Sequence, residues 1–169
     1  MSNEYCENKL IQGSAAKLLQ NALGWEVVYA YNHEVLGANG TFGRKSYKEV
    51  LLPKYFAQAL KQLNSWITDK QIAEAKSILE AHLSTASLLE INEEKYKLIK
   101  DGVQVSVVNE RGEVDKKTAV LIDFDNAERN SFLAVQELKI SGTIHNRRTD
   151  IVGFVNGILG SFARDLEKK

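Results

Sequence analysis

The amino-acid sequence predicts a mixed α+β (α/β) fold, and two features of its pattern support this. The first half is dominated by apolar residues at helical spacing, whereas the part after residue 101 consists of short β-prone runs separated by turns. Helices followed by an antiparallel run of strands are typical of this class. With one proline and no low-complexity tract, the chain is expected to form a single domain over residues 1–169.

The first half should contain four helices and one strand. An amphipathic helix is expected over residues 7–23, ending at Gly24, and a strand over residues 25–31. A glycine-rich loop over residues 37–43 follows. Three further helices are expected over residues 54–63, 69–83 and 85–100, the last with Thr85 or Ser87 as its N-cap.

The second half should be mainly strands. Alternating or apolar β-prone runs predict strands over residues 103–108, 118–124, 132–140 and 150–155, with a turn over residues 109–112. The last of these runs is strongly apolar and ends in Asn156-Gly157, a pair that favours a tight hairpin turn.

Composition excludes several classes of function. Lys plus Arg equals Asp plus Glu, 22 of each, so net charge argues neither for nor against DNA as a partner. Cys6 is the only cysteine, which excludes an intrachain disulfide and fits a reducing cytoplasm. His33, His82 and His145 are far apart, so a zinc site is not expected. No run approaches the ~18 apolar residues of a membrane-spanning helix, and the polar N-terminus lacks the features of a signal peptide.

The glycine-rich loop superficially resembles a nucleotide-binding loop. A Walker A motif needs four residues between its glycines and a lysine directly after the second. Here five residues separate Gly37 from Gly43, and Arg44 precedes Lys45. Because the backbone N–H groups must converge on the phosphates, this register argues against nucleotide binding, and we expect a mobile surface loop.

The carboxylates offer the more specific chemistry. Hydrolysis of a phosphodiester with Mg²⁺ needs hard oxygen ligands, usually two carboxylates, and a nearby lysine can offset charge in the transition state. The PD-(D/E)xK nucleases place an Asp at a strand start and Glu-x-Lys on the adjoining strand. Asp150, at the head of the apolar run over residues 151–155, has the position of such a first ligand.

Two other parts of the sequence match the acidic pattern by spacing alone. Asp123, Glu137 and Lys139 have suitable separations, but Glu137 and Lys139 alternate with apolar residues, as in any half-exposed strand. We therefore interpret this pair as a solvated strand face. Glu167-Lys168-Lys169 lies in a charged, helix-like tail and is interpreted as a chance tripeptide.

In several places, and in the same order, the chain resembles the N-terminal endonuclease domain of the R subunit (HsdR) of type I restriction-modification enzymes. The resemblance runs through residues 7–12, 23–26, 43–52, 59–64, 101–103, 121–124 and 130–132, and it is most specific over residues 147–158. It implies a PD-(D/E)xK restriction-endonuclease-like core with N-terminal and inserted helices. It also implies Mg²⁺-dependent cleavage of double-stranded DNA without sequence preference of its own.

In the complete subunit of this family, an ATP-driven translocase follows the nuclease domain and pulls DNA through the complex. ATP is thus expected only in the full-length subunit and not on this chain. The implied partners are double-stranded DNA and the methyltransferase and specificity subunits, and no membrane.

The resemblance also assigns roles to individual residues. It implies that Asp150 is the first Mg²⁺ ligand, and this is why we prefer Asp150 to Asp123. Glu7 is a candidate auxiliary acid near the metal, although a helix N-terminal carboxylate favoured by the helix dipole is the simpler explanation. Arg147 and Arg148 are candidate DNA contacts. Arg44 and Glu49 belong to a family-like segment, for which we expect a structural ion pair.

The resemblance ends where the second half of the site should begin. After Ile158 the family pattern continues with Pro-Leu, a short apolar strand and Glu-x-Lys, whereas this chain departs from it at Leu159. There are three possible explanations. The numbering skips an internal segment, the coding sequence is truncated or frameshifted, or the chain is a natural variant with an inactive site. We favour the first.

Two other classes of function stay open. One is a docking domain without catalytic activity, which positions the motor against the methyltransferase core. The other is a DNA-binding module, which the zero net charge and the lack of a basic run weaken. Convergence of Asp150 and Glu7 beside a strand end would favour the nuclease, and burial of Asp150 against Arg147 or Arg148 would favour the docking domain.

Overall fold

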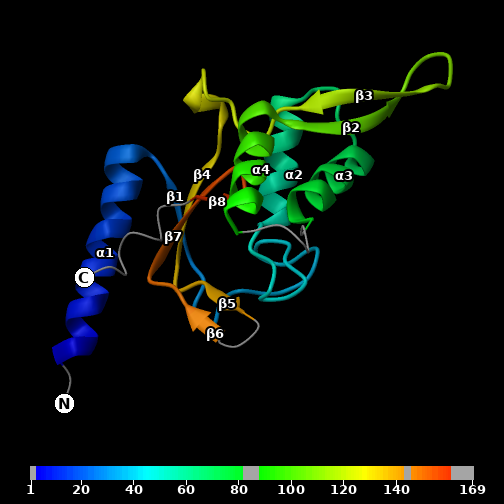
Figure 1. Ribbon diagram of the computed structural model, residues 1–169. Helices are drawn as coiled ribbons and strands as arrows, with labels where there is room; N and C mark the ends of the chain where they lie inside the picture. The colour runs from blue at the N-terminus through cyan, green and yellow to red at the C-terminus, as the bar shows by residue number, and fades with distance from the viewer. Residues whose placement is uncertain (1–2, 82–87, 143–145, 161–169) are drawn as a thin grey trace. The chain divides into compact units, whose positions relative to one another are not determined.

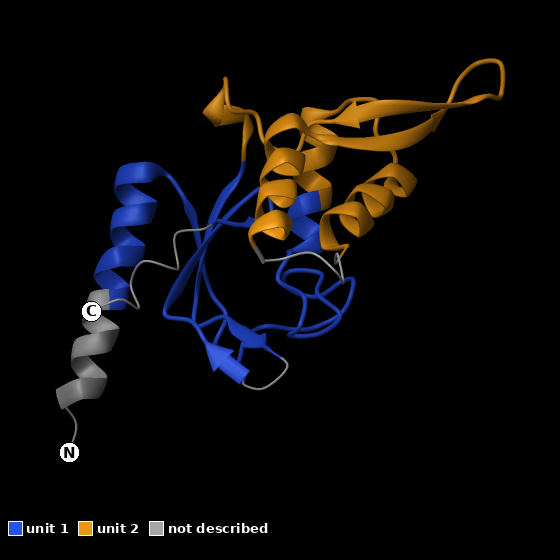
Figure 2. Ribbon diagram, in the orientation of Figure 1, with its two compact units in different colours: residues 1–56, 131–169 blue, residues 57–130 orange. Residues whose placement is uncertain are grey.

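A computed structural model describes residues 3–81, 88–142 and 146–160, with only the backbone described for residues 3–11 and Leu88. The chain divides into two compact units, shown in Figure 2. Unit 1 comprises residues 1–56 and 131–169, and unit 2 comprises residues 57–130. Helices and both parallel and antiparallel strand pairs are present, so the expected mixed α/β class is confirmed. The single domain over residues 1–169 stays a prediction, and each unit is described by itself.

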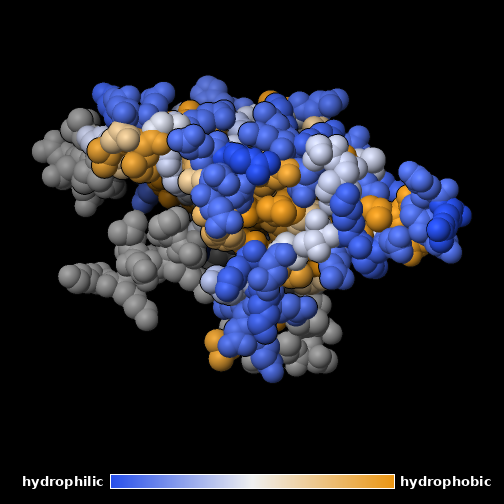
Figure 3. Space-filling model, turned by 90° about the horizontal axis from the view of Figure 1, so that it is seen from above, coloured by the Kyte–Doolittle hydropathy of each residue, from blue (hydrophilic) through white to orange (hydrophobic). Residues whose placement is uncertain are grey.

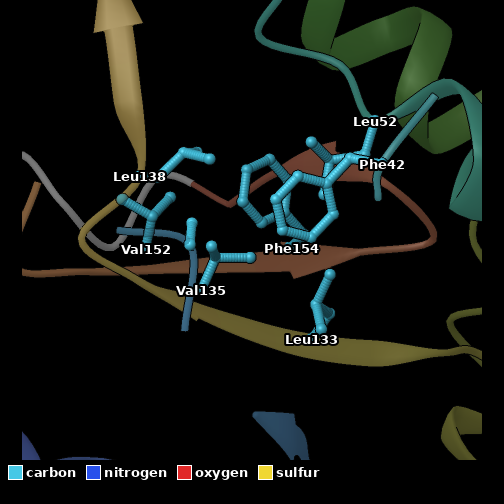
Figure 4. Close-up of a cluster of buried hydrophobic side chains, with 8 residues drawn as sticks. Phe42, Leu52, Leu133, Val135, Leu138, Val152 and Phe154 are labelled. Atoms are coloured by element: carbon cyan, nitrogen blue, oxygen red, sulfur yellow. The ribbon is translucent and has the colours of Figure 1, made fainter. Parts of the chain in front are cut away.

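Unit 1 is built on a four-stranded sheet with the order β1-β4-β7-β8 (Figure 1). β1 (Glu26–Tyr29) runs parallel to β4 (Phe132–Gln136), which pairs antiparallel with β7 (Ile151–Val155). β7 forms a hairpin with β8 (Ile158–Leu159). The sheet buries one face in a hydrophobic cluster, drawn in Figure 4, of Ala30, Phe42, Leu52, Leu133, Val135, Leu138, Val152 and Phe154.

The hairpin turn between β7 and β8 is the predicted Asn-Gly pair. Asn156 and Gly157 both have positive φ, 54° and 76°, as the twist of a two-residue hairpin requires. The turn is also anchored, because the side-chain oxygen of Asn156 accepts a bond from the Ser131 amide (2.7 Å). The Gly157 carbonyl accepts a second bond from the Leu52 amide (2.9 Å). The end of β7 that leads into the turn is therefore anchored to the residue before β4 and to the segment before α2.

Helix α1 (Asn3–Leu23) packs against β1 and β4. Ala16 is buried on this helix, and the helix ends at Gly24, which has φ +68° and donates its amide to Gln20. The expected helix and its stop are thus confirmed. A Cβ on Gly153 would lie 3.0 Å from the ring of Trp25, so a glycine in β7 makes room for that tryptophan.

The strand expected over residues 132–140 is interrupted, and this part of the prediction is wrong. β4 ends at Gln136, Glu137 adopts φ +58°, and β5 (Lys139–Ser141) then pairs with β6 (Asn146–Arg148) in a separate ribbon. Before Glu137 the odd-numbered Leu133 and Val135 enter the core, and after it the even-numbered Leu138 does. The unusual backbone at Glu137 shifts the alternation of inward and outward side chains by one position. Leu138 therefore packs into the core in place of Glu137.

The loop before α2 is packed, in contrast to the expected mobile surface loop. Phe42 and Arg44 are completely buried. The guanidinium of Arg44 forms a bidentate pair with Glu34 (2.8 and 2.6 Å) and donates to the carbonyls of Glu49 (2.9 Å) and Lys139 (3.1 Å). The expected ion pair of Arg44 with Glu49 is therefore wrong in its partner: the carboxylate is that of Glu34, and Glu49 contributes its backbone carbonyl.

Unit 2 contains the expected helices. α2 (Pro53–Leu63), which begins in unit 1, is followed by α3 (Asp69–Glu80) and α4 (Leu88–Asp101). β2 (Val103–Val108) and β3 (Val114–Ala119) form an antiparallel ribbon, and a short 3-10 helix spans Ala127–Arg129. The proposed caps Thr85 and Ser87 lie outside the described residues.

The strand expected over residues 118–124 is wrong beyond Ala119. The buried Asn64 donates to the Val120 carbonyl (2.9 Å) and accepts from the Val120 amide (2.9 Å). Asn130 likewise binds the amide of Asp123 (2.9 Å) and its carbonyl (2.7 Å). Because side-chain amides satisfy these backbone groups, the segment needs no partner strand.

The surface is mainly hydrophilic on the face shown in Figure 3, with smaller groups of hydrophobic residues. Val108 and Val114, near the turn of the β2–β3 ribbon, are 67% and 68% exposed. Within the part of the chain that is described, no helix is both long and apolar enough to cross a membrane.

The Gly157→Ala variant tests the anchoring of the hairpin turn. The added Cβ would lie 2.6 Å from the Phe56 amide and 2.7 Å from the Leu52 carbonyl, at a residue with positive φ. We expect the free energy of unfolding to fall by more than about 1 kcal/mol in urea titrations. Gly13→Ala, in α1 with open space around its Cβ, is the control and should gain about 0.5–1 kcal/mol. An unchanged free energy of unfolding in Gly157→Ala would contradict the close packing around the turn.

The Arg44→Met variant tests the buried ion pair. It leaves Glu34, which is 4% exposed, without its counter-ion, and we expect a loss of about 3–5 kcal/mol in the same titration. Adding Glu34→Leu should restore part of that loss. Lys61→Met, which breaks the exposed Lys61–Asp69 pair, should cost less than about 1 kcal/mol. An equal loss of stability in Arg44→Met and Lys61→Met would refute the structural role of Arg44.

Candidate functional site

Asp150 lies immediately before β7, where three elements of unit 1 meet. Its side chain is exposed, and its Oδ1 accepts a hydrogen bond from Nε2 of Gln12 on α1 (2.7 Å). The carbonyl of Gln12 in turn accepts a bond from the side chain of Gln136, at the end of β4 (3.2 Å). The Asp150 carbonyl accepts a bond from the Glu137 amide (3.1 Å). Gln12 therefore orients the carboxylate, while residues at the end of β4 bind the backbone carbonyls of Gln12 and Asp150.

Gln12 is a site residue that the sequence analysis missed. It lies one helical turn before the buried Ala16 and on the same side of α1, so it is a polar residue in a stripe that faces the sheet. That interruption of the apolar stripe was the available signal. The backbone of Glu7 lies in α1 as expected, but its side chain lies outside the described part of the chain, and its role stays a prediction.

A polar cavity of about 400 Å³ lies in unit 1 beside this carboxylate-bearing strand. It is lined by Ala30, Tyr31, Asn32, Glu34, Tyr47, Glu137, Lys139, Asn146, Arg147 and Arg148. Arg147 and Arg148 belong to β6 and are exposed. Arg148 covers the ring of Tyr31 at 4.0 Å and lies 3.5 Å from the carboxylate of Glu137. Asp150 is exposed and bound to Gln12, and is therefore not buried against either arginine.

Glu137 and Lys139 do not form the plain solvated strand face that their alternation suggested. The backbone at Glu137 leaves the extended conformation, and the two side chains line the cavity on either side of the buried Leu138. Lys139 lies over the ring of Tyr47, with Nζ 4.5 Å from its centre. The interpretation is corrected accordingly: these residues share a concave surface with Arg148.

Asp123 has a structural environment within unit 2. Its carboxylate accepts bonds from the amides of Asp125 (3.2 Å) and Asn126 (2.9 Å) and from the guanidinium of Arg129 (2.8 Å). The Asn126 amide, and then Arg129, hold the pKa of this carboxyl below its ordinary value, against the opposing effect of partial desolvation. The side chain thus stabilises a local turn.

The described residues do not form a complete metal site. Among residues 3–81, 88–142 and 146–160, no three or more His, Cys, Asp or Glu side chains are placed to hold a metal ion. Asp150 offers one hard carboxylate ligand, which suits Mg²⁺, but one carboxylate does not make a complete site. The side chain of Glu7 and the tripeptide Glu167-Lys168-Lys169 lie outside the described residues, so the Mg²⁺ site stays a prediction.

The explanation that we favoured for the departure at Leu159 is wrong. The sequence is continuous from residue 1 to residue 169, and the numbering skips no internal segment. A short strand that the sequence analysis did not predict, β8 (Ile158–Leu159), pairs with β7 at this point. A changed coding sequence and a natural variant are the two explanations that remain.

Comparison with known proteins gives a consistent result. A family model described as type I restriction enzyme R protein N terminus matches residues 4–160. The chain is 30% identical over 154 residues to the type I restriction enzyme HindI endonuclease subunit of Haemophilus influenzae. It is 27% identical over 155 residues to the putative type I restriction enzyme MjaIXP endonuclease subunit of Methanocaldococcus jannaschii. Each alignment covers 90% of this chain and 14% of the relative, so the chain spans about a seventh of their length.

The pKa of Asp123 gives a pH prediction for the folded chain. Because that pKa is lowered on folding, the carboxylate stabilises the fold above the pKa of the unfolded chain, and this stabilisation is lost as the pH falls through the folded pKa. Asp123→Asn should therefore lose less stability than the unchanged chain between neutral and acid pH in urea titrations. Asp125→Asn, in the same turn, is the control. Identical pH dependence in Asp123→Asn and the unchanged chain would contradict the assignment.

Proposed function

Because the chain belongs to the family of N-terminal domains of type I restriction enzyme R proteins, we propose that it is the endonuclease domain of such a subunit. Its reaction is the Mg²⁺-dependent hydrolysis of phosphodiester bonds in double-stranded DNA. In the complete subunit this cleavage is coupled to DNA translocation by an ATP-driven motor, and this chain binds no ATP itself. Its partners are DNA and the methyltransferase and specificity subunits, and its compartment is the cytoplasm.

The position of Asp150 is the observation that carries the proposal. The carboxylate is exposed directly before a strand whose Val152 and Phe154 are buried in the core. Gln12 binds one of its oxygens and limits its rotation. A metal-dependent nuclease needs such a preorganised hard ligand, because a carboxylate that is already oriented loses little entropy when an ion binds.

The surroundings of Asp150 also support an approach by a polyanion. Arg147 and Arg148 are exposed three and two residues before it, and we propose that they contact DNA. Mg²⁺ would supply a Lewis acid at the scissile phosphate. Since the described residues provide one carboxylate for it, the ion needs further ligands, for which the side chain of Glu7 is our candidate.

A docking domain without catalysis is the second candidate. It is supported by the departure from the family pattern at Leu159 and by the incomplete set of metal ligands among the described residues. In that role the domain would position the motor against the methyltransferase core. The exposed and oriented Asp150 favours the nuclease over this alternative.

The test is the Asp150→Ala variant in a full-length R subunit that carries this domain, assembled with its partner subunits. We expect DNA cleavage to fall by at least about a hundredfold, because a metal ligand is lost. ATP hydrolysis and translocation, measured in the same preparation, should be unchanged. Asp123→Asn is the matched control and should cleave normally. Retained cleavage by Asp150→Ala would refute the assignment, and an inactive unchanged subunit that still translocates DNA would favour the docking domain.

A further inference from the structure

The β5–β6 ribbon carries two cations at positions where like charges are unfavourable. The register pairs Lys139 directly with Arg148, so both side chains leave the ribbon on the same face. Like charges directly opposite each other destabilise an antiparallel pair. Such a pair is favoured when an anion is bound between or beside the two cations.

Each of these cations is held by a tyrosine from another part of unit 1. The guanidinium of Arg148 lies 4.0 Å from the ring centre of Tyr31, and Nζ of Lys139 lies 4.5 Å from that of Tyr47. A guanidinium that stacks on a ring keeps its N–H groups at its edge, where they can donate to phosphate oxygens. The tyrosines thus orient the cations and lower the entropy that binding would cost.

The charges that line the cavity leave an excess of positive charge. Glu34 is neutralised by the buried Arg44. Glu137 is the other carboxylate, and its contact with Arg148 is long, at 3.5 Å, with the side chains 19% and 49% exposed. Such a pair contributes little to stability, so an incoming anion can replace it.

We propose that this cavity binds a phosphodiester group of the DNA backbone, with Arg148 and Lys139 as its donors and Glu137 as the counter-ion that the phosphate replaces. The inference rests on DNA as the partner in the proposed function. It assigns Arg148 to the DNA backbone and adds Lys139 and Glu137 to the site. A phosphate fits better than a base, because each tyrosine ring already has a cation over one face. The cavity lies beside the strand end that bears Asp150, since Glu137 binds the Asp150 carbonyl.

The test measures DNA binding without catalysis. The complete 169-residue chain is titrated onto a fluorescently labelled blunt duplex in EDTA, and anisotropy is followed over a series of salt concentrations. The double variant Arg148→Gln/Lys139→Gln should bind roughly tenfold more weakly or worse. The slope of log K against log salt should fall in magnitude by about one, since the two cations neutralise one phosphate and each neutralised phosphate contributes about one.

The Glu137→Gln variant gives a result of opposite sign. Removal of the competing carboxylate should tighten binding, by roughly two- to fivefold at low salt. A misfolded variant would not produce tighter binding, so this arm separates a role in binding from a role in folding. Tyr31→Leu, which keeps every charge, should weaken binding less than the double variant does.

Arg111→Gln/Lys117→Gln in the β2–β3 ribbon is the matched control. It removes the same charge and also includes a stacked cation, since Lys117 lies 4.4 Å from the ring centre of Trp66. Its affinity and salt slope should match those of the unchanged chain. Equal weakening in the control, no change in Glu137→Gln, or no DNA binding by the unchanged chain would each overturn the proposal.

The outcome is independent of the cleavage assay. If Asp150→Ala abolishes cleavage while the double variant binds DNA normally, this inference fails and the proposed nuclease stands. If the binding results are as expected while Asp150→Ala still cleaves, the phosphate site stands and the metal-ligand assignment fails.

Discussion

The buried pair between Arg44 and Glu34 is the interaction on which the region around the candidate site depends. A buried charge destabilises a protein unless its polar groups are hydrogen-bonded. The Arg44 guanidinium donates to one carboxylate and to two backbone carbonyls. One of those carbonyls belongs to Lys139. The pair therefore joins the glycine-rich loop to the β5–β6 ribbon and fixes one wall of the polar cavity.

The second constraint is the change of alternation at Glu137. A strand that continued without it would direct Glu137 towards the core that holds Leu133 and Val135. The positive φ at Glu137 places Leu138 in the core instead. The same change turns the chain into β5, and it gives Asp150 a backbone partner in the Glu137 amide. One residue thus separates the packed sheet from the polar surface that we propose to contact DNA.

Taken together, these features place the candidate metal ligand and the proposed phosphate site on neighbouring parts of unit 1. Gln12 orients the carboxylate of Asp150, and two tyrosines orient the cations of the ribbon. The zero net charge of the chain is compatible with this arrangement, because a local excess of positive charge can attract a polyanion when the remaining charges lie elsewhere.

The sequence by itself determined the elements whose causes are local. The apolar spacing in α1 with its stop at Gly24, the helices of unit 2, the apolar run of β7 and the Asn156-Gly157 turn were all predictable. The position of Asp150 directly before a strand was also predictable.

The tertiary structure decided what depends on partners distant in the sequence. Residues 120–124 have the composition of a strand, but the side chains of Asn64 and Asn130 take their hydrogen bonds. The glycine-rich loop looked mobile because the sequence does not show that Glu34 neutralises Arg44 in the interior. Gln12 became a site residue only when α1 packed beside the start of β7. Periodicity reports which side of an element is buried, whereas the pairing of buried polar groups is settled only when the elements meet.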